Sequence, residues 1–152
     1  MKTDIDITVS YPHPPSRVWE ALTSSEALAA WFMPNDFQPV AGHRFTFQTK
    51  PRRAFGFDGV VRCQVLELDP PHRMVWSWAG GSIDTTVTFT LEPAAGAGTT
   101  LRMRQVGFHG LGAQLTRTIL AGGWARILRQ RLLACLEQPA EAPAGPGAAG
   151  CR

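Results

Sequence analysis

Residues 83–104, IDTTVTFTLEPAAGAGTTLRMR, alternate apolar and polar side chains on both sides of a turn rich in alanine and glycine. A period of two residues is typical of a strand with one buried face and one solvent-exposed face. The alternation breaks only over residues 94–98 and resumes with Leu101 and Met103. We therefore predict an antiparallel hairpin whose two strands share one apolar face.

Further elements are expected before this hairpin. The same alternation, or a run of β-branched and apolar residues, indicates strands at residues 4–11, 44–48, 57–68 and 74–78. Apolar residues at helical spacing predict two short helices after the first strand. One follows the proline-rich segment 12–15, with Ser16 or a neighbour as its cap, and the other begins near Ser24 and ends before Pro34.

From about Gln114 to Glu137 the apolar period changes to that of a helix, the longest element expected. The glycine pair at 122–123 weakens the helix interior by about 1 kcal/mol per residue relative to alanine. We therefore expect a kink or a close approach of the sheet at this point. Residues 138–152 are rich in proline, alanine and glycine, so we expect a folded domain at 1–137 and a disordered tail at 138–152.

The composition indicates an ordinary globular protein. The chain has 152 residues, of which 44% are hydrophobic and 18% charged, close to average usage. The net charge is +3, but the basic residues are scattered, and Arg52–Arg53 is the only adjacent Lys/Arg pair. No apolar run approaches the roughly 20 residues that cross a bilayer. We expect a bacterial, cytoplasmic protein that binds neither nucleic acid nor a membrane.

No spacing of residues suggests a metal site or a cofactor. The cysteines Cys63, Cys135 and Cys151 show no C-x-x-C pair and cannot all pair with one another, which fits a reducing compartment. We interpret Cys63 and Cys135 as small core residues and assign no role to Cys151. The four histidines have no carboxylate or cysteine at ligand or triad spacing.

The order of these elements is similar to the helix-grip arrangement of the START-like (SRPBCC) superfamily, which includes the birch pollen allergen. Local motifs resemble the family named for activators of the heat-shock protein 90 ATPase, namely RVWEALT at 17–23, WF at 31–32, TVTFTLE at 86–92, GTTL at 98–101 and GW at 123–124. The resemblance implies an α+β helix-grip fold, a curved antiparallel β-sheet wrapped around a long C-terminal α-helix. Many relatives have a cavity between sheet and helix, but their activities differ, so the fold alone leaves the function open.

The inward faces of the strands and of the last helix carry more large apolar side chains than a thin core needs, including most of the five tryptophans. We interpret this set as a concave pocket for a small hydrophobic or aromatic molecule, with a solid core as the alternative. The candidate ligand-binding residues are Trp31, Phe45, Phe47, Met74, Trp76, Trp78, Val87, Phe89, Met103, Gln105, His109, Leu120, Trp124 and Leu128.

Two of these candidates are polar. Gln105 is the group expected to hydrogen-bond a ligand from a strand end, and His109 lies in a glycine-rich loop that could gate the pocket or simply be exposed. The leading hypothesis is a non-enzymatic binding protein. One alternative is a cyclase or hydrolase in which His109, Gln105 or Tyr11 carries protons. The other is an interaction module for a chaperone or another protein, with a homodimer also open.

Overall fold

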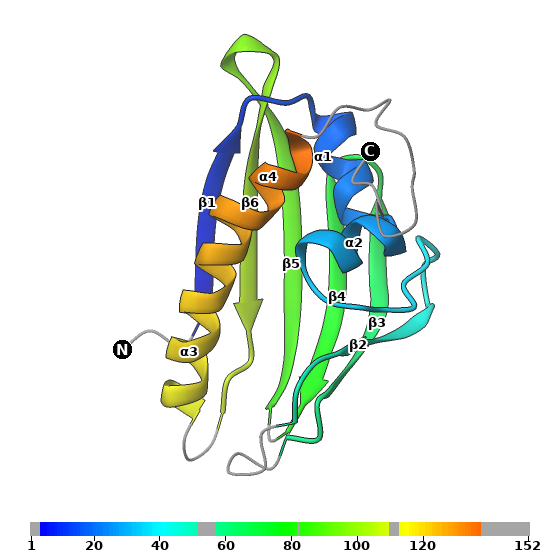
Figure 1. The fold of residues 1–152 in the computed structure, drawn as a ribbon, viewed down its shortest axis with the longest axis vertical. Coiled ribbons are helices and arrows are strands. Elements are labelled where there is room, and N and C mark those ends of the chain that lie inside the picture. The colour runs from blue at the N-terminus through cyan, green and yellow to red at the C-terminus, as the bar shows by residue number, and fades with distance from the viewer. Residues whose placement is uncertain (1–3, 52–56, 82, 110–112, 138–152) are drawn as a thin grey trace.

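The computed structural model describes residues 4–51, 57–81, 83–109 and 113–137. The expected tail at 138–152, with Cys151, and the pair Arg52–Arg53 lie outside the described residues, as do residues 110–112 of the glycine-rich loop. The domain boundary expected after residue 137 therefore stays a prediction. Figure 1 shows a sheet with its helices on one face, which confirms the α+β helix-grip prediction.

The described strands form one six-stranded antiparallel sheet in the order β1-β6-β5-β4-β3-β2. Their bounds are Ile5–Tyr11 for β1, Arg44–Gln48 for β2, Val60–Asp69 for β3, Arg73–Gly80 for β4, Ile83–Ala94 for β5 and Gly98–Val106 for β6. The predicted hairpin is confirmed, because β5 pairs with β6 across the turn η2 (Ala95–Ala97) and places Phe89 opposite Met103. The first strand, β1, pairs with the last strand, β6, and forms one edge of the sheet.

The two short helices are confirmed as α1 (Pro15–Leu22) and α2 (Ser25–Trp31). The capping prediction was wrong for α1. Its N-cap is Pro14, without a side-chain hydrogen bond, and Pro15 opens the helix because its fixed φ suits the first helical position. In α2, Ser24 caps as expected, since its hydroxyl accepts a hydrogen bond from the Ala27 amide at 3.2 Å.

The C-terminal helix runs from α3 (Ala113–Arg126) through a π-helical turn, η3 (Ile127–Arg131), into α4 (Leu132–Leu136). The expected close approach of the sheet at the glycine pair is wrong, because a β-carbon added to Gly122 or Gly123 would meet nothing within 4 Å. The irregularity lies one turn later, in η3. There the hydroxyl of Tyr11 donates to the Leu128 carbonyl at 2.6 Å and ties β1 to the helix.

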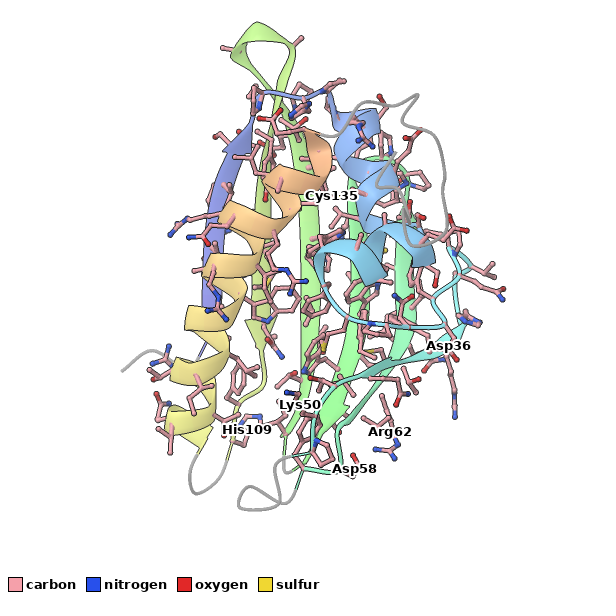
Figure 2. All side chains as sticks on the ribbon, in the orientation of Figure 1. Asp36, Lys50, Asp58, Arg62, His109 and Cys135 are labelled. Carbon is pink, nitrogen blue, oxygen red and sulfur yellow. The ribbon has the colours of Figure 1, made fainter. Side chains whose placement is uncertain are left out.

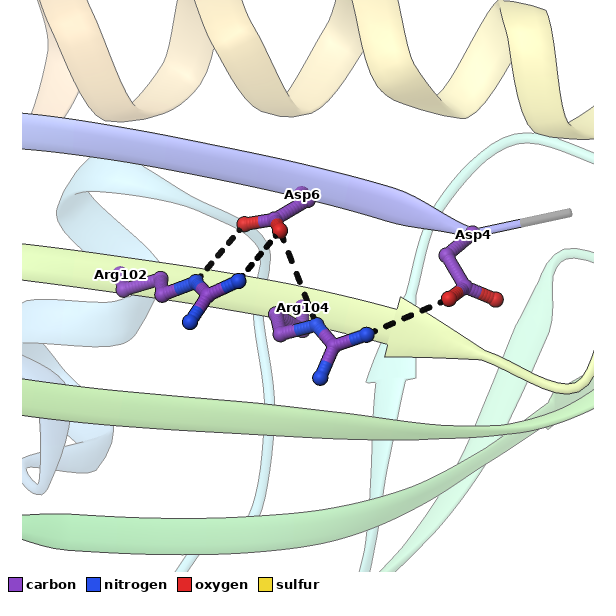
Figure 3. A network of polar contacts seen from close by, with 4 residues as sticks. All are labelled: Asp4, Asp6, Arg102 and Arg104. Carbon is purple, nitrogen blue, oxygen red and sulfur yellow. Dashed lines mark hydrogen bonds and ion pairs between the residues drawn. The ribbon is translucent and has the colours of Figure 1, made fainter. Parts of the chain in front are cut away.

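The outer face of β1 and β6 carries paired charges (Figure 3). The guanidinium of Arg102 donates to both carboxylate oxygens of Asp6, at 3.0 and 2.6 Å. Arg104 lies 3.3 Å from Asp4 and 3.7 Å from Asp6. These arginines point away from the helices, as the alternation predicts, and their charge is balanced by Asp6 of β1 and by Asp4, which precedes this strand.

Candidate functional site

The aromatic side chains predicted to line the pocket pack against one another instead. Trp76 lies with its ring centroid 4.9 Å from Phe89 and 5.3 Å from Phe45, in edge-to-face geometry. Trp124 of α3 comes within 5.5 Å of Trp78. Offset and edge-to-face rings at these distances form a dense core. Side chains therefore fill the space between helix and sheet along this middle part of the molecule.

The remaining apolar candidates belong to the same cluster. Leu120 is partly buried and packs against the cluster, and the other six are buried, namely Trp31, Phe47, Met74, Val87, Met103 and Leu128. Burial on this face is what the alternation predicts, but these side chains contact each other rather than an open space. Their role in ligand binding is untested.

A cavity of about 320 Å³ opens beside this core, between α3 and the neighbouring ends of the strands. Its volume is at the lower end of the range typical of small-molecule sites. Its lining consists of Met33, Thr49, Lys50, Phe57, Val61, Trp78, Gly80, Gly81, Ile83, Thr116, Ile119 and Leu120. Of the fourteen candidates, only Trp78 and Leu120 are among these residues.

One wall of the cavity comes from α3. Thr116, Ile119 and Leu120 are spaced three and four residues apart, which places them on one face of the helix. The opposite wall comes from the strands and the segments that connect them. There Gly80 leaves room for the ring of Phe57, because a β-carbon at Gly80 would come within 3.2 Å of the Phe57 Cε1 atom.

The sequence contained partial signals for these missed residues. Val61 and Ile83 occupy apolar positions in strands that the alternation predicts correctly. Gly80 and Gly81 marked the end of a strand. Because glycine has no side chain, space can remain beside these two positions. Met33 follows α2, and no periodicity pointed to it. Phe57 begins the strand predicted at residues 57–68, where the alternation places it on the same face as Val61.

Gln105 does not face the cavity. Its side chain is fully buried, and its Oε1 atom accepts a hydrogen bond from the indole N–H of Trp124 at 2.9 Å. Its Nε2 atom donates to the Thr85 hydroxyl at 2.8 Å, and that hydroxyl donates to the Trp78 carbonyl at 3.0 Å. The chain of hydrogen bonds joins α3 to β6, β5 and β4, so Gln105 holds the helix against the sheet.

The proton carriers of the enzyme hypothesis are not brought together. Tyr11 pairs with Thr99 and Gln105 with Ile5, six residues apart along β6, which is roughly 20 Å of strand. Burial raises the pKa of the Tyr11 hydroxyl far above its usual range. His109 is exposed and is not part of the cavity lining.

The side chains that could hold a metal ion are dispersed in the described part of the chain. Within it, no three His, Cys, Asp or Glu side chains are grouped so as to hold a metal ion. Cys63 and Cys135 are buried, as their assignment to the core predicts, and burial raises the pKa of the Cys63 thiol.

One charged group borders the cavity. Lys50 follows β2, and Figure 2 shows it at the same end of the molecule as Asp58 and His109, away from Cys135. Asp58 is engaged elsewhere, because Arg62 donates to its carboxylate at 3.0 Å and holds the pKa of that group below its usual value. Among the described residues that line the cavity, Lys50 is the one ionisable side chain.

This geometry can be set beside known proteins. The family model described as Activator of Hsp90 ATPase homolog 1-like protein matches residues 12–137. The chain belongs to this family. The match confirms the resemblance that the sequence motifs predict, and it spans every element that borders the cavity. No curated protein matches the chain significantly.

Solved structures extend the comparison. A protein from Mesorhizobium loti is 29% identical, with a TM-score of 0.74, and the match covers 88% of this chain and 99% of that one. A protein from Bacillus halodurans is 28% identical, with a TM-score of 0.73 and coverage of 88% and 96%. The Aha1 dimer from Colwellia psychrerythraea is 21% identical, with a TM-score of 0.73 and coverage of 90% and 97%. At that identity the last likeness shows the fold alone.

Among the described residues, no helix is both long enough and apolar enough to span a membrane. Family members of this kind bind ligands or act as chaperone cofactors.

Proposed function

We propose that this member of the family binds a small hydrophobic molecule in the cavity between α3 and the strand ends. The observation that supports the proposal most directly is the cavity of about 320 Å³ itself. Most of its lining side chains are apolar, which suits a ligand held by exclusion from water. In this proposal the aromatic cluster borders the site through Trp78 and does not surround the ligand.

The wall formed by α3 includes a large apolar side chain that is more than half exposed. Ile119 lines the cavity and is 55% exposed, and Leu115, one turn earlier, is 57% exposed. Apolar side chains with this much exposed surface contribute little to the stability of the protein core. A ligand in the cavity would remove part of the Ile119 surface from water, which favours binding by about 25 cal/mol per Å² buried.

The test uses N-phenyl-1-naphthylamine, a neutral fluorescent probe whose emission rises in apolar surroundings. The native chain should show saturable binding. Thr116→Phe places a ring into the cavity from α3 and should weaken binding by about fivefold or more. Thr118→Phe is the matched control, because Thr118 lies on the same helix, is exposed and does not line the cavity.

Equal loss of binding in both variants would place the probe elsewhere on the helix. Absence of saturable binding to the native chain by this probe and by a panel of neutral aromatic and aliphatic molecules would overturn the proposal. Far-ultraviolet circular dichroism of each variant reports whether the fold is retained.

The alternative functions stay predictions. For the enzyme hypothesis, Tyr11 and Gln105 lie at opposite ends of the β1–β6 pair, and His109 is exposed and outside the cavity lining. An interaction role, either with a chaperone or in a homodimer, has the exposed apolar pair Leu115 and Ile119 in its favour. Light scattering of the native chain against a Leu115→Lys variant would detect a dimer formed through that pair.

A further inference from the structure

The cavity is apolar inside and, among the residues that the structure describes, carries one charged side chain at its rim. Most of the lining side chains are apolar, namely Met33, Phe57, Val61, Trp78, Ile83, Ile119 and Leu120. No aspartate or glutamate is among the lining residues, whereas Lys50 is. We propose that the ligand is an amphipathic anion, with an apolar body in the cavity and a carboxylate or similar acidic group beside the ammonium of Lys50. This inference rests on the proposed function.

The ammonium of Lys50 has no competing partner in the described part of the chain. None of the ion pairs there involves Lys50. The carboxylate of Asp58 accepts hydrogen bonds from Arg62 and from the Val60 amide, at 3.0 and 3.1 Å. The positive charge of Lys50 is thus available to a ligand that brings its own negative charge.

The backbone holds Lys50 at this position. The Thr49 amide donates to the Gly59 carbonyl at 2.8 Å, and the Gln48 amide donates to the Pro34 carbonyl at 2.9 Å. Gly59 has a φ of +85°, and a β-carbon there would meet the Thr49 carbonyl oxygen at 2.6 Å. A glycine is therefore required for the segment after β2 to approach β3 this closely, which places Lys50 at the rim.

Exposure of Lys50 suits this role. An anionic group moved into an apolar cavity without a partner would lose its hydration, which is strongly unfavourable. At the rim the acidic group keeps much of its water while it gains a charge-assisted contact with the ammonium. The apolar body alone then occupies the interior. The arrangement favours an amphipathic acid over a neutral molecule with the same hydrophobic body.

The test compares two probes that differ in one group. The sulfonate 1-anilinonaphthalene-8-sulfonate has the same ring system as N-phenyl-1-naphthylamine with an added negative charge. Lys50→Gln should weaken binding of the sulfonate by about fivefold or more and change binding of the neutral probe by less than about twofold. Arg131→Gln is the matched control, since it removes the same net charge from an exposed position outside the lining.

A dodecanoate and dodecanol pair, used as competitors for the neutral probe, gives an independent readout. Lys50→Gln should weaken competition by dodecanoate and leave that by dodecanol unchanged. The proposed role of Lys50 is wrong if Lys50→Gln weakens the binding of neither anion, or if it weakens the binding of both members of each pair equally. Saturable binding of the neutral probe would then still support the cavity as a binding site. If the native chain binds neither naphthalene probe and neither dodecyl compound, the proposed function itself fails.

Discussion

The two halves of the C-terminal helix differ in how they meet the sheet. In η3 and α4, Leu128 and Leu132 are fully buried. In α3, Leu115 and Ile119 are more than half exposed, and a cavity lies between this half and the strand ends. Trp124 marks the change, because its indole is hydrogen-bonded to Gln105 of β6. One half of the helix therefore holds the fold together, and the other leaves space.

This division has a physical reason. A side chain that faces a void has no partner atoms on one side and loses the dispersion contacts that a packed core supplies. Such a loss is tolerated only where the rest of the domain is stable without it, and binding surfaces are commonly drawn from the less stable parts of a fold. The packed half and its aromatic cluster provide that stability here.

The largest effect expected from this comparison is on Leu132. Leu132→Ala should lower the free energy of unfolding by about 2 to 5 kcal/mol, because it removes methyl groups from a filled core. Ile119→Ala, in the other half, should lower it by only about 0.5 kcal/mol, as is usual for exposed sites. Urea unfolding followed by tryptophan fluorescence measures both. Similar losses in the two variants would show that the halves are packed alike.

Gln105 tests the junction between the halves. Gln105→Leu leaves the indole N–H of Trp124 without its acceptor inside the core and should lower the free energy of unfolding by about 1 to 3 kcal/mol. The same urea titration measures it. The matched control is Arg104→Leu, an adjacent exposed position on the outer face of β6. A stability equal to that of the native chain would mean that Gln105 does not clamp the helix.

A smaller effect than that of Leu132→Ala or Gln105→Leu is expected at Gly122 of α3. Gly122→Ala should raise the free energy of unfolding by about 1 kcal/mol, because alanine favours a helix interior and finds open space there. Gly59→Ala should have the opposite sign, since its φ is +85° and the added carbon would meet backbone. Thermal unfolding by circular dichroism distinguishes the two. Destabilisation by Gly122→Ala would show that α3 lies closer to the sheet than this structure has it.

Much of the fold followed from local patterns. Strict alternation over residues 83–104 predicted the β5–β6 hairpin, and the helical period after Gln114 predicted the last helix. Both patterns depend on which face of an element is buried, and the spacing of apolar residues that are close in sequence reveals that face. The cap of α1 and the π-helical turn were not predicted, since they depend on Pro14 and on contacts such as that of Tyr11 with Leu128.

The site was harder to predict for a different reason. Alternation correctly placed Trp76 and Phe89 on the inner face, but it contains no information on whether a facing side chain fills the space beyond them. Trp78 and Leu120 were found because they lie where the filled core meets the cavity. Lys50 was missed because the segment that follows β2 has no period that reveals the direction of its side chains. Phe57 was missed because no residue of the strand predicted at 57–68 was assigned to the pocket.

The amino-acid sequence by itself determined the element order, the inward face of each strand and the family, because each depends on short-range patterns that survive without knowledge of distant contacts. Only the tertiary structure decided where the core is filled and where it is open. Packing depends on how side chains from α3, β3, β4 and β5 meet in three dimensions. The cavity is the volume between these elements that their side chains do not fill, so it depends on all of them at once.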